Sequence, residues 1–121
     1  MFQNLDLFQQ SAALARHAGR AQSLIARNIA NADTPGYQAR HLAPFDPGDR
    51  GGTWQATRAG HLSPEGQGAR ILTATEATSP NGNSVSLESE IFAAVEAQRS
   101  HNNALAIYRH ALTMIRTAVK G

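Results

Sequence analysis

Histidines are the residues of this chain that most readily suggest chemistry, because imidazole binds metal ions and transfers protons near neutral pH. The five histidines are His17, His41, His61, His101 and His110, and no two stand at the spacing of a metal-ligand pair. The sequence HExxH of helical zinc sites does not occur either. We therefore expect no metal site, and we interpret His17 and His101 as polar positions at helix interfaces or on lumen-facing surfaces.

Other catalytic patterns are also missing from the sequence. It contains no GxSxG nucleophile turn, no glycine-rich phosphate loop and no cysteine. Glu88 and Glu90 stand two residues apart on a predicted helix, where side chains diverge, so we interpret them as partners of the helix dipole. Trp54 is better explained as the anchor of a local cluster than as a ligand-stacking residue. These observations predict no enzyme activity, no catalytic residue, no cofactor and no small-molecule substrate.

The charge pattern argues against a nucleic-acid partner. The formal net charge is only +2, and the cations are dispersed along the chain. Binding to phosphates generally requires clustered cations. A helical nucleic-acid-binding protein would carry its arginines on one face, whereas Arg16, Arg20 and Arg27 belong to a mixed surface.

The N-terminal segment, residues 1–32, has the periodicity of a long helix. We expect the helix over residues 5–32, with Asn4 as N-cap and Asp6 in the first turn. Residues 1–19 hold neither a basic leader nor a long apolar run, which predicts no secretory signal peptide. The expected helical seam steps by threes and fours through Leu7, Ser11, Leu14, Ala18, Ala21, Ile25, Asn28 and Ala32.

A second helix is predicted over residues 86–121, with Ser86 as its cap. Its apolar stripe alternates steps of four and three, as in coiled coils, and a second apolar row beside it suggests a second neighbour. The stripe is Leu87, Ile91, Ala94, Gln98, His101, Leu105, Tyr108, Leu112, Ile115 and Val119, and the second row is Ala104, Ile107, Ala111, Met114 and Ala118.

The connection between the helices, residues 33–85, holds all five prolines and most of the glycines. Thr53–Arg58 and Ala69–Thr75 are the two short segments that could form strands. We predict one mainly α domain over residues 1–121. Its long terminal helices pair as an antiparallel coiled-coil-like hairpin, and its loop-rich middle can hold a short β-hairpin. Helices this long are difficult to cover within one small chain, which points to neighbouring subunits.

The most specific pattern lies where the first helix must stop. Pro35 pushes Thr34 out of the helical conformation, so the helix should end by Asp33. Pro35 and Gly36 fit the central positions of a type II turn, which needs positive φ at its glycine. Tyr37 can then pack back on the last helical turn.

This segment resembles the A-N-x-x-T-P-G-Y motif of the bacterial flagellar rod and hook protein family. Residues 83–90, NSVSLESE, resemble the N-x-V-x-L-x-x-E start of the C-terminal helix in its small rod proteins, and residues 112–118, LTMIRTA, resemble the tail of a proximal rod protein. The motif residues of the helix stop are Ala30, Asn31, Thr34, Pro35, Gly36 and Tyr37.

The resemblance implies a structural subunit of the flagellar basal-body rod, whose terminal helices pair around the export channel. It also implies a route through the flagellar type III export apparatus without a cleavable signal peptide. The implied partners are other copies of the chain, rod proteins of the FlgC and FlgF types, and the ring-to-rod adaptor FliE. We expect the assembly interface to use Leu14, Ala18, Ala21, Ile25, Leu87, Ile91, Ala94, Leu105, Tyr108, Leu112, Ile115 and Val119.

Two alternatives remain open. Ser86 stands where an acid is common in the proximal rod protein and Ile91 where methionine is common, so a sister rod protein also fits. Outside the family, a helical adaptor or chaperone would share the long helices but would not need the Thr-Pro-Gly-Tyr stop. Such a protein would form a stable small oligomer in solution.

Overall fold

The computed structural model describes residues 2–47, 70–74 and 79–120. In chain order these form the helix α1 (Phe2–Ala30), the strands β1 (Arg40–Leu42) and β2 (Ile71–Thr73), and the helix α2 (Leu87–Lys120). The predicted strand at Thr53–Arg58 lies outside the described residues.

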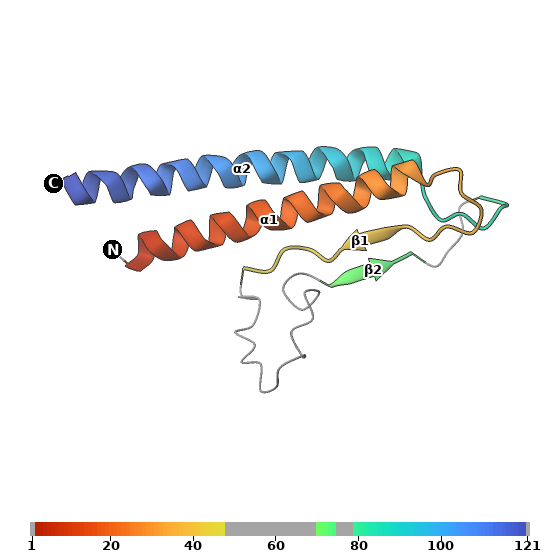
Figure 1. Cartoon of the computed structure of the whole chain (residues 1–121), viewed down its shortest axis with the longest axis horizontal. Coiled ribbons are helices and arrows are strands. Elements are labelled where there is room, and N and C mark those ends of the chain that lie inside the picture. The colour runs from red at the N-terminus through yellow and green to blue at the C-terminus, as the bar shows by residue number, and fades with distance from the viewer. Residues whose placement is uncertain (1, 48–69, 75–78, 121) are drawn as a thin grey trace, which may run out of the picture.

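The two helices run side by side in opposite directions, so that both chain termini lie at the same end of the molecule (Figure 1). We call this the open end and the other the closed end. Toward the open end, the rings of Phe8 and Tyr108 stack at 4.4 Å between centroids. Closer to the closed end, Gln22 Nε2 donates to Gln98 Oε1 at 2.8 Å. The predicted mainly α fold with an antiparallel helix pair is confirmed.

Small residues predominate in the buried rows of the two helices. On α2 the buried residues recur every seven positions, at Glu90, Ala97, Ala104 and Ala111. On α1 the same spacing gives Ser11, Ala18 and Ile25. A seven-residue repeat is the spacing of coiled-coil contacts, and alanine lets the two backbones approach closely.

This innermost row of α2 differs from the predicted stripe. Ala104 and Ala111 belong to the row predicted to lie beside it, and both are fully buried. Larger residues of the predicted stripe, such as Tyr108 and Leu112, flank this row and are only half-buried. The difference follows from size, because a leucine or tyrosine at the point of closest approach would force the helices apart.

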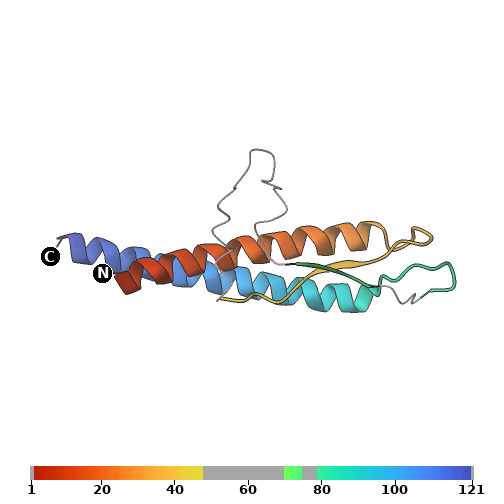
Figure 2. The ribbon, with the colours of Figure 1, turned by 90° about the horizontal axis from the view of Figure 1, so that it is seen from below.

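A small antiparallel sheet lies beside α1, and Figure 2 shows it from a second side. Arg40 pairs with Thr73 and Leu42 with Ile71. Strand β2 falls inside the predicted segment Ala69–Thr75. Strand β1 was not predicted from the sequence.

The observed ends of the two helices differ from the predicted ones. α1 begins at Phe2, so Asn4 lies inside the helix and is not its N-cap, and Asp6 lies beyond the first turn. No proline or glycine precedes Asn4 to stop the helix there. α2 begins at Leu87, and the Ser86 carbonyl accepts the Glu90 amide at 2.9 Å. Among the described residues, no helix is long and apolar enough to cross a bilayer.

Candidate assembly interface

The stop after α1 is the predicted type II turn. The Tyr37 amide donates to the Thr34 carbonyl at 3.3 Å across Pro35 and Gly36. Gly36 has a φ of 72°, the positive value that this turn requires. The Asn31 side-chain amide donates to the Arg27 carbonyl at 2.8 Å, and the Asn31 backbone amide donates to the same carbonyl at 3.2 Å.

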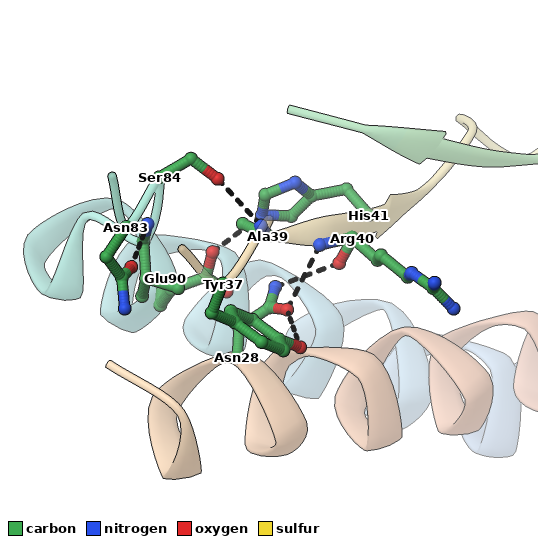
Figure 3. Close-up of polar contacts among 9 residues, drawn as sticks. Asn28, Tyr37, Ala39, Arg40, His41, Asn83, Ser84 and Glu90 are labelled. Atoms are coloured by element: carbon green, nitrogen blue, oxygen red, sulfur yellow. Dashed lines mark hydrogen bonds and ion pairs between the residues drawn. The ribbon is translucent and has the colours of Figure 1, made fainter. Parts of the chain in front are cut away.

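Tyr37 packs back on α1 as predicted, and its target is a buried asparagine. Its hydroxyl donates to Asn28 Oδ1 at 3.1 Å. The same oxygen accepts the Arg40 amide at 3.1 Å, and Asn28 Nδ2 donates to the Arg40 carbonyl at 2.8 Å (Figure 3). The Asn28 side chain therefore pairs with β1 as a neighbouring strand would, and this attaches the sheet to the helix.

Asn83 caps the end of α1, although it lies about 50 residues later in the sequence. Its Nδ2 group donates to the carbonyls of Asn31 at 2.9 Å, Ala32 at 2.9 Å and Thr34 at 2.7 Å. Its Oδ1 accepts the Val85 amide at 2.7 Å. With 1 % of its surface exposed, Asn83 connects the chain just before α2 to the helix stop after α1.

Backbone contacts reinforce this connection. The Ser84 amide donates to the Tyr37 carbonyl at 2.9 Å, and Ser84 Oγ accepts the Ala39 amide at 2.7 Å. The Gly36 amide donates to the Asn81 carbonyl at 3.0 Å. The two sequence motifs, one at each side of the long connection, therefore form a single structure. We call this structure, made by residues 28–41 and 79–90, the closed-end junction.

Glu90 has a different role from the predicted one. It lies in the first turn of α2, but it is only 1 % exposed. Its Oε1 forms a hydrogen bond of 2.7 Å with His41 Nε2 from β1 (Figure 3). Among the described residues, Oε2 has no hydrogen-bond partner. Glu90 is therefore a buried link between β1 and α2, and helix-dipole compensation alone does not explain its place.

Of the other described histidines, His17 contacts a backbone carbonyl and an aromatic ring. His17 Nε2 donates to the Ala43 carbonyl at 2.8 Å, and its ring meets Phe45 edge-on. His101 is half-buried. Within the part of the chain that the structure describes, no three His, Asp or Glu side chains gather as a metal site would require. His61 lies outside that part.

The predicted assembly residues divide into two groups. Those facing the partner helix are buried or half-buried and already have neighbours within the hairpin: Leu14, Ala18, Ala21, Ile25, Ala94, Tyr108, Leu112 and Ile115. The others are exposed, namely Leu87 by 51 %, Ile91 by 55 %, Leu105 by 38 % and Val119 by 81 %.

Two large exposed side chains of α2 lie outside both apolar rows predicted from the sequence. Phe92 is 71 % exposed and Val95 57 % exposed. They lie just off the predicted stripe, and the signal available was the spacing of Val95, four residues after Ile91 and three after Phe92. We call Ile29, Leu87, Ile91, Phe92 and Val95 the closed-end patch. A shallow groove here is lined by Ile29, Ile91, Ala94, Val95, Gln98, Arg99 and Asn102.

Comparison with known families gives one match. Residues 8–38 match the family described as flagella basal body rod protein. The matched segment covers most of α1 and continues through the turn at Pro35 and Gly36. A comparison with curated proteins finds no match for the chain. The family match and the helical hairpin together support the flagellar basal-body rod protein family, which is a family of structural components and not of enzymes.

Proposed function

We propose that the chain is a structural subunit of the proximal rod of the flagellar basal body, of the FlgB type. In this role it transmits torque through packing and forms part of the wall of the export channel. The observation that carries the proposal is the row of large apolar side chains left exposed along α2, among them Ile91, Phe92 and Val119. A structural subunit would cover these side chains with neighbouring subunits.

The closed-end junction suits this mechanical role. Asn28, Asn83 and Glu90 are each no more than 1 % exposed, and each joins two segments far apart in the sequence. Buried polar groups of this kind are costly to separate, because each one would be left without a partner. Force applied to one helix is therefore passed to the other helix and to the sheet.

The partners follow from the same proposal. They are other copies of the chain, rod proteins of the FlgC and FlgF types, the ring-to-rod adaptor FliE, and the type III export apparatus that delivers the chain without a cleavable signal.

The FlgB assignment rests on the likeness of residues 112–118 to the FlgB tail. FlgC is the second candidate, because Ser86 and Ile91 depart from the FlgB pattern. Cross-linking to FliE in purified basal bodies tests FlgB directly, and adducts with other rod proteins alone would favour FlgC.

Leu105→Asp tests the rod assignment. Leu105 is partly exposed on α2, so an aspartate there should leave the hairpin folded but place an unpaired charge in any subunit contact. We expect to find the tagged wild-type chain in purified basal bodies. We expect the variant to be exported but not to be incorporated into them. The exposed polar neighbour Asn103→Asp is the control and should assemble normally.

Two outcomes would reject the proposal. The first is the absence of the wild-type chain from basal bodies. The second is a stable small oligomer in the cytoplasm that holds another flagellar protein, which would identify an adaptor or chaperone.

A further inference from the structure

The closed-end junction contains a tight turn at residues 79–82. The Gly82 amide donates to the Ser79 carbonyl at 3.1 Å, and the Ser79 amide donates to the Asn83 carbonyl at 3.1 Å. Among the described residues only glycines have positive φ, so the φ of Asn81, the third residue of the turn, is negative, which excludes a type II turn and fits type I. Gly82 follows with a φ of 85°. Asn81 and Gly82 are both exposed.

Asn81 and Gly82 form the one Asn-Gly pair in the sequence. In such a pair the backbone nitrogen of the glycine can attack the side-chain amide of the asparagine and close a five-membered ring. Glycine favours this reaction, because no side chain crowds its nitrogen and its backbone rotates freely. Each of the other six asparagines precedes a residue that carries a side chain, which slows the same attack. By its sequence, Asn81 is therefore the asparagine most open to this chemistry.

In the folded junction, other contacts hold both reacting groups. Asn81 Oδ1 accepts the Asn83 amide at 3.1 Å, which fixes the side-chain amide group. The Gly82 nitrogen, which is the attacking atom, donates its hydrogen to the Ser79 carbonyl. The Asn81 carbonyl accepts the Gly36 amide at 3.0 Å. Ring closure requires rotation of the peptide between Asn81 and Gly82, and this rotation breaks the bonds that its carbonyl and its nitrogen make.

Gly82 also packs against the helix stop after α1. A Cβ atom at Gly82 would lie 3.5 Å from Gly36 Cα, which is van der Waals contact. The turn at residues 79–82 is therefore attached to the type II turn at Pro35 and Gly36 by packing as well as by a hydrogen bond. Rotation within one turn disturbs the other.

We propose that Asn81 is a deamidation site that the closed-end junction protects, and that the reaction takes place in chains whose junction has not formed. The Gly82 nitrogen forms a bond to Asn81 Cγ, and the bond from Cγ to Nδ2 breaks. Nδ2 leaves as ammonia and takes the hydrogen of the Gly82 amide. Water then adds to either carbonyl of the ring and opens it, which gives aspartate or isoaspartate with no oxidation or reduction. This inference goes beyond the proposed function and does not depend on it.

The two products should affect the junction differently. Aspartate keeps a side-chain oxygen that accepts the Asn83 amide. Isoaspartate directs the main chain through the former side chain, which lengthens the main chain by one carbon atom and removes this acceptor. Asn83, two residues later, is then displaced from the carbonyls of Asn31 and Thr34 that it caps. A chain that carries isoaspartate should therefore fail to rebuild the closed-end junction.

Peptide mass spectrometry tests the site and its protection. The purified chain is incubated at mildly alkaline pH, folded with sucrose in one sample and unfolded with urea in the other. Trypsin then releases residues 71–99, which contain both Asn81 and Asn83, and a sample taken at zero time corrects for reaction during digestion. We expect the mass gain of deamidation at Asn81 in urea. In sucrose the rate should be lower by about tenfold or more, because the reaction there needs local opening of the turn.

Two controls accompany this measurement. Asn83 lies in the same peptide and precedes Ser84, so it should react much more slowly than Asn81 in urea. Gly82→Ala, compared with the wild type in urea alone, should slow the reaction at Asn81, because its methyl group crowds the attacking nitrogen. Folding plays no part in that comparison.

The effect on the junction is measured on the products. Chains aged in urea are separated by charge, refolded in sucrose and compared with the Asn81→Asp variant by thermal unfolding. Both carry the same additional negative charge, so any difference reports the longer main chain of isoaspartate. We expect the isoaspartate fraction to unfold at a lower temperature than Asn81→Asp.

Three outcomes would overturn the inference. With no mass gain at Asn81 in urea, the site does not exist. Equal rates in urea and in sucrose would mean that the junction gives no protection. Equal unfolding temperatures of the isoaspartate fraction and Asn81→Asp would mean that the junction tolerates the longer main chain. Incorporation into basal bodies enters none of these measurements, so the proposed function is tested separately.

Discussion

Around the turn at Thr34–Tyr37, some features of the structure could be predicted from single residues and others could not. The type II turn could be predicted because Pro35 and Gly36 carry their own backbone preferences. The roles of Asn28 and Asn83 could not be predicted, because an asparagine amide pairs equally well with many backbone groups. The acceptors of Asn83 lie about 50 residues away in the sequence.

Gly36→Ala and Gly19→Ala should change stability in opposite directions. A Cβ at either glycine would meet no atom within 4 Å, so neither change creates a clash. At Gly36 the φ of 72° is unfavourable for alanine, and we expect a loss of about 1–2 kcal/mol in unfolding free energy. At Gly19, inside α1, alanine should add about 0.5–1 kcal/mol.

Thermal unfolding followed by helical circular dichroism measures both glycine variants, with sucrose added to strengthen the folded state. Equal effects at the two sites would show that the turn does not depend on positive φ.

Asn83→Ala and Asn83→Asp test the cap on α1. Alanine removes the side-chain donor from the carbonyls of Asn31, Ala32 and Thr34, which should cost about 1–3 kcal/mol in unfolding free energy. Aspartate keeps the acceptor for Val85 but cannot donate, so it should be at least as damaging. Exposed Asn103→Ala is the control. A mild Asn83→Asp would argue that the amide donor is unimportant.

At the scale of elements, the helices could be predicted because their apolar periodicity continues over many turns. The register of α2 was harder to predict, because two neighbouring rows carry apolar residues and only side-chain size at the contact separates them. Strand β1 is three residues long and is held by Asn28 and by β2. A strand defined by distant partners leaves no periodic signal of its own.

A double-mutant cycle of His41→Ala and Glu90→Gln measures the link between β1 and α2. Removing His41 leaves the buried Glu90 carboxyl group without its partner, and we expect a loss of about 1–3 kcal/mol in unfolding free energy. In a Glu90→Gln background the buried group is neutral, so the same histidine change should cost less. Exposed Glu88→Gln is the control. Additive effects would mean that the two side chains do not interact energetically.

At the scale of the whole molecule, the described core is thin. Its buried apolar residues are Ala18, Ile25, Ala39, Val85, Ala97, Ala104 and Ala111, so most of them are alanines. A buried methyl or methylene group contributes about 0.8 kcal/mol, while ordering the backbone costs about 1–2 kcal/mol per residue. Under the proposed function, further apolar area is buried when subunits pack against the exposed residues of α2.

We expect the isolated chain to be only partly ordered and to become ordered as the rod assembles. Amide hydrogen exchange should be fast across both helices in the dilute purified chain and slow in purified basal bodies, because the neighbours that bury Ile91, Phe92 and Val119 are present only there. Protection should rise with sucrose, which strengthens burial of the small core without supplying a subunit contact. Within the isolated chain, the residues around Asn83 should be the slowest to exchange, because the closed-end junction holds its hydrogen bonds without help from a neighbour. Strong protection along both helices in a monodisperse monomer would show that one hairpin is sufficient for order, and the exposed face of α2 would then need an explanation other than assembly.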